Sequence, residues 1–255
     1  MLCHDESTIH VQIANMSEQP LTSPTQPEAD RIRQLFDRIA PQYDRLNQDL
    51  SLGLHRIWKQ MAVQWSGAKE GMHCLDLCCG SGDLALLLAR QVGPTGQVIG
   101  ADFAVEQLAI AAQRSLYLQD RLTWIEADAL DLPFQDNHFD AATMAYGLRN
   151  LTDIPRGLSE LHRVLKPGAK AAILDFHAPT NPIVRQFQQW YLANIVVPTA
   201  ERFGLSEEYA YISPSVDRFP SGARQVELAK AASFTQATHY PIAGGLMGVL
   251  VASKG

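Results

Sequence analysis

The residues best suited to chemistry lie in a glycine loop between an apolar segment and an amphipathic one. The segment HCLDL (73–77) leads into Cys79-Gly80-Ser81-Gly82-Asp83-Leu84-Ala85, which matches the pattern G-x-G-x-x-A. After a strand and before a helix, such a loop lets the backbone approach a nucleotide-like cofactor closely. Asp102 ends the next apolar run, about 20 residues after Gly82, where a carboxylate commonly accepts ribose hydroxyls. We therefore expect the cofactor to contact Gly80, Ser81, Gly82 and Asp102.

The charge around this loop separates two cofactor classes, NAD and S-adenosylmethionine (SAM). Asp83 stands in the first turn of the predicted helix, and Asp76 lies within the preceding strand. A pyrophosphate docks on such a helix N-terminus. At ~5 Å and an effective dielectric of about 20, each carboxylate opposes a phosphate charge by about 3 kcal/mol. The ammonium and sulfonium of SAM are instead stabilised by these acids, so we expect SAM.

A third element supports a SAM site. Asp128 and Ala129 follow the third predicted strand, in the segment IEADALDLPFQDNHFD. In a SAM enzyme this position brings an acid or amide near the adenine amino group. We therefore expect both residues to contact the cofactor, and four carboxylates, including Asp128, to surround it.

The elements that must position this loop alternate between short apolar runs and amphipathic segments. Strands are expected over 73–77, 97–101, 122–126, 140–145 and 170–176, and helices over 83–92, 104–115 and 155–165. This alternation is typical of βαβ units and a doubly wound sheet. A polar helix near 222–232 precedes two more strand-like runs, 234–240 and 246–253, joined at Gly244–Gly245 as an antiparallel hairpin. The predicted fold is α/β, with the seven-stranded, mostly parallel, Rossmann-like sheet of class I methyltransferases.

The segments outside the sheet predict a leader and a cap on one domain, residues 31–255. Residues 1–30 are expected to be a disordered leader, with Met16 as an alternative start. Helical periodicity begins at Ile32, and Pro41 is expected to end that helix. A second amphipathic stretch places one apolar face on Leu54, Ile57, Trp58, Met61 and Trp65. Residues 179–220 predict an inserted helical cap, whose apolar side chains are Ile183, Phe187, Trp190, Tyr191, Ile195 and Val196.

The charge and cysteine content of the chain exclude some classes of binding partner. Lys and Arg number 21 against 27 Asp and Glu, and the net charge of −6 speaks against a broad nucleic-acid-binding face. Cys3 lies in the leader, while Cys74, Cys78 and Cys79 crowd one apolar segment without a CxxC pair. We therefore expect reduced, buried thiols, no metal site and a cytoplasmic location. Contact with a membrane surface stays open, because several arginines flank the apolar face of residues 32–39.

The fourth predicted strand leads into Ala145-Tyr146-Gly147-Leu148-Arg149-Asn150. The Asn/Asp-Pro-Pro-aromatic motif of enzymes that methylate nucleobase amines does not occur there. No cysteine lies beyond Cys79 to serve as the nucleophile of a pyrimidine C5 methylase. Both observations argue against a nucleic-acid methylase.

Six segments together resemble one family. They are FDRIAPQYDRLNQDLSLGLHRIWK (36–59), LDLCCGSGD (75–83), DALDLPFQDNHFD (128–140), YGLRN (146–150), RVLKPG (163–168) and RFPSG (218–222). Over residues 31–254 the chain resembles the UbiE/MenG ubiquinone/menaquinone biosynthesis C-methyltransferases. The form CCGSGD, where the ubiquinone branch has GGTGD, is similar to the phylloquinone branch of cyanobacteria and plastids.

The resemblance implies SAM-dependent C-methylation of a prenylated naphthoquinol, with a phytyl tail in the phylloquinone branch. It implies Arg149 as the cation that stabilises the phenolate and Asn150 as the group that orients the ring oxygen. Tyr43 is expected as a donor or relay, with packing as the alternative. His55 is a candidate base, although a structural role is favoured, and His177 is a further candidate to face the pocket.

Several alternatives stay open at this point. The acceptor could be a menaquinone- or ubiquinone-type ring or another phenolic or lipid molecule. A non-catalytic SAM-binding module of a quinone-synthesis complex is the alternative outside enzymology. A homodimer and a peripheral place at a thylakoid or inner membrane also remain open.

Overall fold

Seven strands form one sheet in the order β3-β2-β1-β4-β5-β7-β6. The computed structural model describes residues 26–51 and 53–255. The strands are β1 (His73–Leu77), β2 (Gln97–Asp102), β3 (Leu122–Glu126), β4 (Phe139–Ala145), β5 (Leu165–Phe176), β6 (Gln236–Ile242) and β7 (Met247–Ser253). The first five pair in parallel, whereas β7 is antiparallel to both β5 and β6. The predicted fold class is confirmed, including the closing hairpin.

The strand order creates a crevice at one edge of the sheet. After β1 the chain builds outward through β2 and β3, and then returns to β4 on the other side of β1. Leu77 pairs with both Ala101 and Met144, so the carboxyl ends of β1, β2 and β4 meet at the same edge. In such sheets ligands bind where the order reverses. The glycine loop and the segment after β4 therefore face each other across this edge.

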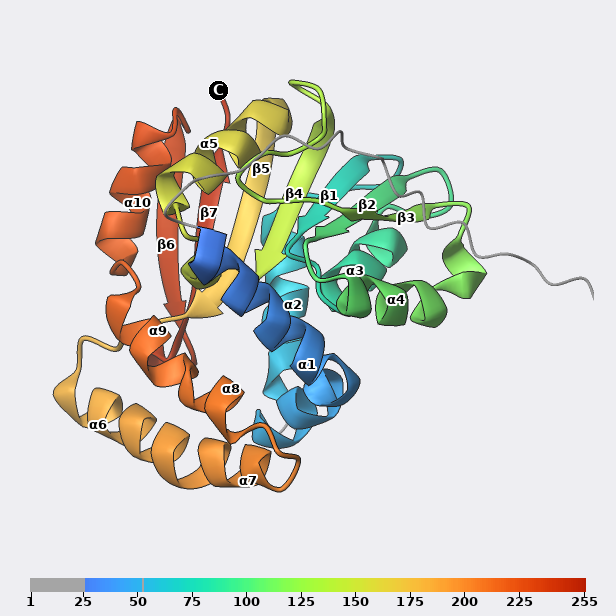
Figure 1. Ribbon diagram of the computed structural model, residues 1–255. Coiled ribbons are helices and arrows are strands. Elements are labelled where there is room, and N and C mark those ends of the chain that lie inside the picture. The colour runs from blue at the N-terminus through green and yellow to red at the C-terminus, as the bar shows by residue number, and fades with distance from the viewer. Residues whose placement is uncertain (1–25, 52) are drawn as a thin grey trace, which may run out of the picture.

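Helices cover both faces of the sheet (Figure 1). Helices α2 (Leu54–Trp65), α3 (Asp83–Gln91) and α4 (Val105–Arg114) pack on one face, and α5 (Ile154–Val164) and α10 (Gly222–Ala231) pack on the other. The alternation along β1 explains this, because Cys74 joins the first core cluster while Leu75 and Leu77 join the second. Short 3₁₀ turns, η1 (Leu116–Leu118), η2 (Leu148–Asn150) and η4 (Ala243–Gly245), connect these elements.

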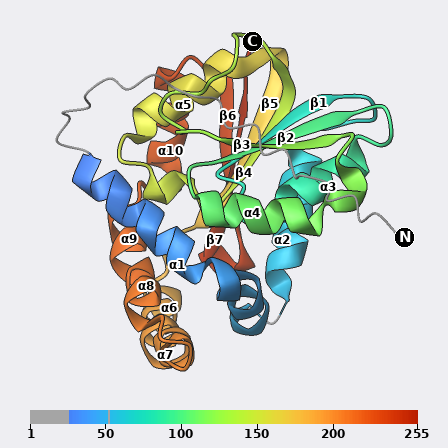
Figure 2. The same ribbon diagram turned by 45° about the vertical axis from the view of Figure 1, so that its right-hand side comes forward.

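A third group of helices lies beyond the carboxyl edge of the sheet (Figures 1 and 2). Helix α1 (Gln26–Leu50) packs against α4, and the segment after β5 forms α6 (Pro182–Tyr191), the π-helical η3 (Leu192–Val196), α7 (Val197–Glu201), α8 (Ser206–Ala210) and α9 (Ile212–Arg218). Their shared core contains Ile39, Leu46, Leu192, Val196, Ala200, Leu205 and Tyr209. The region predicted as a cap is thus helical and packs on α1.

Two predictions about the leader helices are wrong. Residues 26–30, assigned to a disordered leader, are helical, and α1 continues through Pro41 instead of ending there. An internal proline costs roughly 3 kcal/mol, but Ile39 and Leu46 are buried on either side of it, and this packing outweighs the cost. The rest of the predicted leader, residues 1–25 with Cys3 and Met16, lies outside the described residues.

The predicted apolar face of α2 is also partly wrong. Helix α2 buries His55, Lys59, Ala62 and Val63, whereas Leu54 and Ile57 are exposed. The physical reason is that two polar side chains on the buried face have polar partners inside the protein, described below. No helix within the described residues is both long and apolar enough to cross a membrane.

The close approach of β2 to β3 requires a glycine at position 100. A Cβ built there would clash with Cζ3 and Cε3 of Trp124, whose Nε1 donates a hydrogen bond to Ser115 Oγ over 2.9 Å. We expect Gly100→Ala to lower the free energy of unfolding by about 1–3 kcal/mol, because an overpacked core must rearrange. Urea titration followed by circular dichroism measures this loss. The loss should be smaller in a Trp124→Phe background, and an equal loss in both backgrounds would show that the ring is not the obstacle.

Candidate active site

Two cavities meet at the carboxyl edge of the sheet. The first, which we call the loop cavity, encloses about 220 Å³ between α1 and the ends of β1 to β4, and its lining includes Ile32, Gly80, Asp102, Gln107, Asp128, Ala129, Tyr146 and Asn150. The second, the cap cavity, encloses about 170 Å³ between α1, α2, α6 and α8, and its lining includes Phe36, His55, Trp58, Tyr146, Arg149, Phe176, Gln188, Tyr191 and Met247. Tyr146 and Phe36 line both, so they stand between the two cavities.

Asp102 anchors the glycine loop. Its Oδ2 accepts a hydrogen bond from Gly80 N at 2.8 Å, and its Oδ1 accepts one from Ala104 N at 2.9 Å. Burial raises the pKa of this carboxyl to about 6, although the backbone hydrogen bonds oppose the rise. A carboxylate offers about four lone-pair sites, so acceptor capacity remains for hydroxyl groups in the loop cavity.

Two residues that line the loop cavity each carry a buried amide oxygen without a partner among the described residues. Gln107 Oε1 and Asn150 Oδ1 accept no hydrogen bond from any described residue. Unsatisfied buried acceptors are rare in native proteins and commonly mark a ligand site. Together with Asp102, they suit a ligand rich in hydroxyl, amino and ammonium donors. SAM carries these donors, and the acceptors of the cavity therefore fit it.

Asp76 is buried beneath the loop and not at its surface. Its Oδ2 accepts from Ala85 N at 2.9 Å, and its Oδ1 accepts from Thr143 Oγ1 at 2.8 Å. Burial raises the pKa of Asp76 to about 7, and these two hydrogen bonds counteract part of the rise. The carboxyl thus ties the start of α3 to β4 and lines a small cleft beside the glycine loop.

Asp83 is neutralised by two cations. Lys59 Nζ lies 2.7 Å from its Oδ2, and Arg114 Nη2 lies 2.6 Å from its Oδ1. Burial alone would raise the pKa of Asp83, but the positive charges and hydrogen bonds of both partners outweigh it and hold the pKa at about 2. Arg114 also donates to the carbonyl and hydroxyl of Ser81. We had expected the carboxylate of Asp83 to repel a phosphate of NAD. That expectation is wrong, because Lys59 and Arg114 already balance its charge.

Asp128 is exposed at the rim of the loop cavity. Its Oδ1 accepts a hydrogen bond from Leu130 N at 2.8 Å, which shapes the turn after β3. The neighbouring Ala129 is buried and also lines the cavity. Both residues follow the end of β3 and lie beside the loop cavity.

The segment Tyr146–Asn150 turns sharply at the end of β4. Tyr146 has a φ of 61°, in the left-handed region, and its N–H donates to Leu174 O of β5. A non-glycine residue in this conformation is held by its surroundings. The turn also needs glycine at 147, because a Cβ there would contact the Cys78 side chain at 2.5 Å. The backbone thus brings Tyr146 beside the glycine loop.

Arg149 fixes this turn through a buried ion pair with Asp175, the second-last residue of β5. Arg149 Nη1 lies 2.6 Å from Asp175 Oδ1 and also donates to Tyr146 O, while the Arg149 N–H donates to Asp175 Oδ2. The guanidinium stacks 5.0 Å from the ring of Phe176. Its Nε has no partner among the described residues, so one donor of a side chain that lines the cap cavity stays available.

The other predicted acceptor residues fall in different places. Asn150 lines the loop cavity, and its Nδ2 donates to Tyr146 O, so its position favours contact with the cofactor over contact with the ring oxygen. His55 lines the cap cavity, with its Nδ1 2.7 Å from Ser51 Oγ. His177 packs against His239 and is not among the residues that line the cap cavity. Tyr43 belongs to α1, but its side chain lies outside the described part of the chain.

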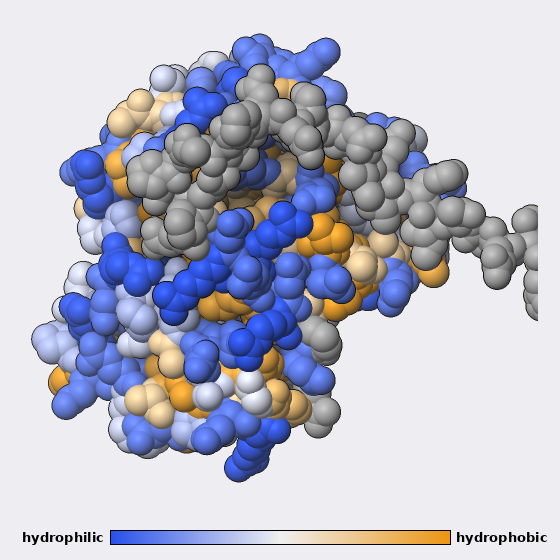
Figure 3. Space-filling model, in the orientation of Figure 1, coloured by the Kyte–Doolittle hydropathy of each residue, from blue (hydrophilic) through white to orange (hydrophobic). Residues whose placement is uncertain are grey.

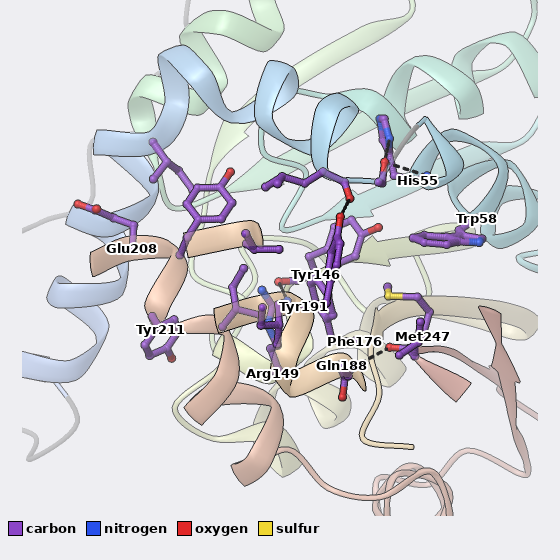
Figure 4. A pocket seen from close by; sticks show the side chains of 18 of the residues that line it. His55, Trp58, Tyr146, Arg149, Phe176, Gln188, Tyr191, Glu208, Tyr211 and Met247 are labelled. Carbon is purple, nitrogen blue, oxygen red and sulfur yellow. Dashed lines mark hydrogen bonds between the residues drawn. The ribbon is translucent and has the colours of Figure 1, made fainter. Parts of the chain in front are cut away.

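The cap cavity has a mixed aromatic and aliphatic lining. Figure 4 shows Tyr146 and Phe176 beside Arg149 near the middle of the cavity, with Trp58 and Met247 on one side and Tyr211 and Glu208 on the other. The rest of the lining includes Leu35, Ile39, Leu192, Val196 and Ile212. Tyr191 Oη donates to Leu50 O at 2.6 Å and joins α6 to the end of α1 across the cavity. Such a cavity suits a planar ring that carries a long apolar tail.

The cysteines near the glycine loop are free thiols without an activated form. Cys74, Cys78 and Cys79 are free thiols, and burial raises the pKa of Cys74 to about 12 and those of its two neighbours further. They therefore stay protonated and unreactive at neutral pH. No cluster of three or more potential metal ligands occurs over residues 26–51 and 53–255.

Sequence reasoning missed four residues that build the site. Lys59 and Arg114 pair with Asp83, Asp175 pairs with Arg149, and Gln107 offers a free acceptor. A signal was present for Asp175, because an acid at the carboxyl end of a buried parallel strand points to the ligand edge. The other three lie on helices, where their side-chain direction depends on packing.

The fold and the two cavities define a class I SAM-dependent methyltransferase. Solved structures of this class share the architecture at low sequence identity. A SAM-dependent methyltransferase from Aquifex aeolicus matches with a TM-score of 0.57 at 21% identity, covering 76% of this chain and 88% of that one. Phosphoethanolamine N-methyltransferase 2 of Haemonchus contortus, solved in complex with SAM, matches with a TM-score of 0.59 at 18% identity, covering 77% and 52%.

The chain belongs to the ubiE/COQ5 methyltransferase family, whose model matches residues 25–254. It is 68% identical over 227 residues to the 2-phytyl-1,4-naphtoquinone methyltransferase of Nostoc sp., covering 88% of this chain and 99% of the relative. It is 53% identical to the chloroplastic 2-phytyl-1,4-beta-naphthoquinone methyltransferase of Arabidopsis thaliana, covering 87% of each. The family resemblance and the SAM cofactor predicted from the sequence are confirmed.

The raised pKa of Asp102 predicts that SAM affinity depends on pH. The carboxyl is ionised above about pH 6, which is the form able to accept hydroxyl hydrogen bonds, and protonated below it. We expect the affinity to weaken as the pH falls through about 6, by up to about tenfold per pH unit. Isothermal titration at several pH values measures this. Asp102→Asn should bind weakly without this pH dependence, and a flat wild-type affinity through the window would contradict the assignment.

Proposed function

We propose that this enzyme transfers the methyl group of SAM to a ring carbon of a phytylated naphthoquinol, the reduced form of 2-phytyl-1,4-naphthoquinone. The observation that carries the proposal is the cap cavity, which adjoins the loop cavity at Tyr146 and has a mainly aromatic and aliphatic lining. The names of relatives at 68% and 53% identity support the same substrate class.

The substrate must be the quinol because a quinone ring is electron-poor and its carbon cannot attack a methyl group. In the two-electron-reduced quinol, a deprotonated hydroxyl pushes charge onto the adjacent ring carbon. When bound, SAM supplies an electrophilic methyl group on a sulfonium. A carbon–carbon bond forms as the carbon–sulfur bond breaks, and the ring then loses its carbon-bound proton. The protein contributes mainly by positioning the reactants and stabilising charge.

The residues that line the loop cavity bind the cofactor. Asp102 accepts the ribose hydroxyls, while Gln107 Oε1 and Asn150 Oδ1 accept from amino or ammonium groups. Asp128 and Ala129 bind near the adenine at the rim. Because the glycine loop is held by Asp102 and Arg114 before any ligand binds, the backbone needs little rearrangement.

Arg149 stabilises the phenolate on the acceptor side. Its guanidinium lines the cap cavity, yet its charge is already balanced by Asp175. It therefore acts as an oriented hydrogen-bond donor and not as a free cation. A donor that is fixed before the reaction costs no reorganisation when negative charge develops on the ring oxygen. Tyr146 lines both cavities and aligns the acceptor ring with the methyl group of SAM.

The substrate assignment predicts a specific product. Purified enzyme incubated with isotopically labelled SAM and reduced 2-phytyl-1,4-naphthoquinone should place the label on a ring carbon, because only the quinol carbon is nucleophilic at that position. Mass spectrometry and NMR of the product measure the site of transfer. The same reaction with benzoquinols is the control for acceptor class. Label found only on oxygen, or on neither substrate, would contradict the proposal.

The role of Arg149 predicts a separation of binding from turnover. Removing the arginine alone would leave Asp175 buried and unpaired, at a cost of about 3–5 kcal/mol. The variant Arg149→Met with Asp175→Asn avoids that cost. We expect it to fold and bind SAM with nearly normal affinity while kcat falls about 10²-fold or more. Arg149→Lys, which keeps a cation beside Asp175, is the matched control and should lose less of kcat. Loss of SAM binding in step with kcat, or an unchanged kcat, would refute this role.

A further inference from the structure

The buried face of α2 carries a histidine into the wall of the cap cavity. Lys59 turns inward because its Nζ reaches Asp83 Oδ2 at 2.7 Å, and the same ammonium lies 5.8 Å from the ring centre of Tyr146. His55 stands one helical turn before Lys59, and residues four apart share one face of a helix. It is therefore buried, with 5% of its surface exposed, and lines the same cavity as Tyr146. The ion pair of Lys59 thus explains why a polar ring lies in a mainly apolar cavity.

Ser51 fixes the orientation of this imidazole. Its Oγ lies 2.7 Å from His55 Nδ1 and also accepts a hydrogen bond from the His55 N–H over 3.4 Å. Since Ser51 engages Nδ1, the second ring nitrogen, Nε2, is the one that a ligand of the cavity would bond. A serine hydroxyl both donates and accepts, and a neutral imidazole carries one donor and one acceptor. Nε2 can therefore accept a hydrogen bond from a ligand or donate one to it.

Arg149 and His55 lie at different places around the same aromatic side chains. The Arg149 guanidinium stacks on Phe176, whose ring lies 5.7 Å from that of Tyr146. In Figure 4 His55 lies on the same side of the cavity as Trp58, whereas Arg149 lies near the middle beside Tyr146. A planar ring that packs on Tyr146 would therefore meet polar side chains at two separate parts of its edge.

Helix α1 shields such a ring from water. Leu35, Phe36 and Ile39 of α1 line the cavity, whereas the outer surface of the same helix is mainly hydrophilic (Figure 3). A hydroquinone carries two hydroxyl groups on opposite carbons of its ring. A hydroxyl that leaves water without gaining a hydrogen-bond partner loses free energy. When one oxygen lies at Arg149, the other one therefore needs a second partner from the protein.

We propose that Nε2 of His55, oriented by Ser51, hydrogen-bonds the second oxygen of the acceptor ring, opposite the oxygen that Arg149 stabilises. His55 contacts the substrate, and Ser51 is a positioning residue. The two contacts hold both ends of the hydroquinone, so that the ring carbon beside the first oxygen stays in line with the methyl group of SAM. The inference rests on the proposed function for its ligand, a hydroquinone.

A double cycle of variant and ligand tests this contact. The ligands are 1,4-naphthalenediol and 1-naphthol, which lacks the second hydroxyl. Isothermal titration of the enzyme loaded with S-adenosylhomocysteine, without oxygen so that the diol stays reduced, measures both affinities. In His55→Asn the amide keeps the bond to Ser51 at the position of Nδ1 but has no atom at the position of Nε2. We expect it to bind the diol about tenfold more weakly and 1-naphthol nearly as wild type does, because one hydrogen bond to the ligand is lost.

Further variants separate the contact from a structural role. His55→Gln, whose amide reaches the position of Nε2, should recover most of the affinity for the diol. Ser51→Ala should weaken diol binding by a smaller factor, because the imidazole loses its fixed orientation. His162→Asn is the matched control and should bind both ligands like wild type, since His162 packs on Phe234 and lies outside the cavity lining. Equal losses for the two ligands in His55→Asn, or no loss with either, would overturn the contact.

Turnover distinguishes a failure of this inference from a failure of the proposed function. If the diol shows the expected coupling to His55 but wild-type enzyme transfers no methyl group to reduced 2-phytyl-1,4-naphthoquinone, the proposed function fails and the contact stands. If the methyl group is transferred to this substrate and His55→Asn affects the two ligands alike, the proposed function stands and the contact is refuted.

Discussion

The buried ion pair between Arg149 and Asp175 is the interaction on which the acceptor side of the site depends. It joins the end of β5 to the turn after β4 and draws the Tyr146 carbonyl into the same network. That turn holds Tyr146 in a left-handed conformation between the two cavities. Because a buried pair is costly to break but contributes little net stability, its value here lies in geometry. The pair therefore fixes the position of Tyr146, which lies at the boundary between the loop cavity and the cap cavity.

The acidic residues of the cofactor region have different structural roles, which the number of negative charges does not reveal. Asp102 and Asp76 hold backbone groups, and burial raises the pKa of both. Asp83 serves as the meeting point of α2, α3 and α4 through Lys59 and Arg114. The electrostatic argument for SAM over NAD therefore reached the correct cofactor partly for the wrong reason. Free acceptors in the loop cavity, and not an excess of negative charge, account for the fit.

Local sequence predicted the sheet well because β1 to β4 and β7 are short, mainly apolar runs bounded by turn residues. The bounds predicted for β1 and β3 agree with the structure, and the glycine loop lies where its spacing required. The errors have one origin, which is packing between segments distant in sequence. Pro41 is tolerated because α6 to α9 pack on α1, and α2 turns Lys59 inward because Asp83, 24 residues away, is its partner. The same cause hid Asp175, 26 residues from Arg149.

A crystal structure of the enzyme with S-adenosylhomocysteine and 1,4-naphthalenediol tests the central claim most directly. The account predicts the nucleoside in the loop cavity, with its ribose hydroxyls bonded to Asp102. It predicts the ring in the cap cavity beside Arg149, with one oxygen accepting from the guanidinium and the sulfur facing a ring carbon past Tyr146. A ring bound outside the cap cavity, or a nucleoside bound away from Asp102, would contradict it.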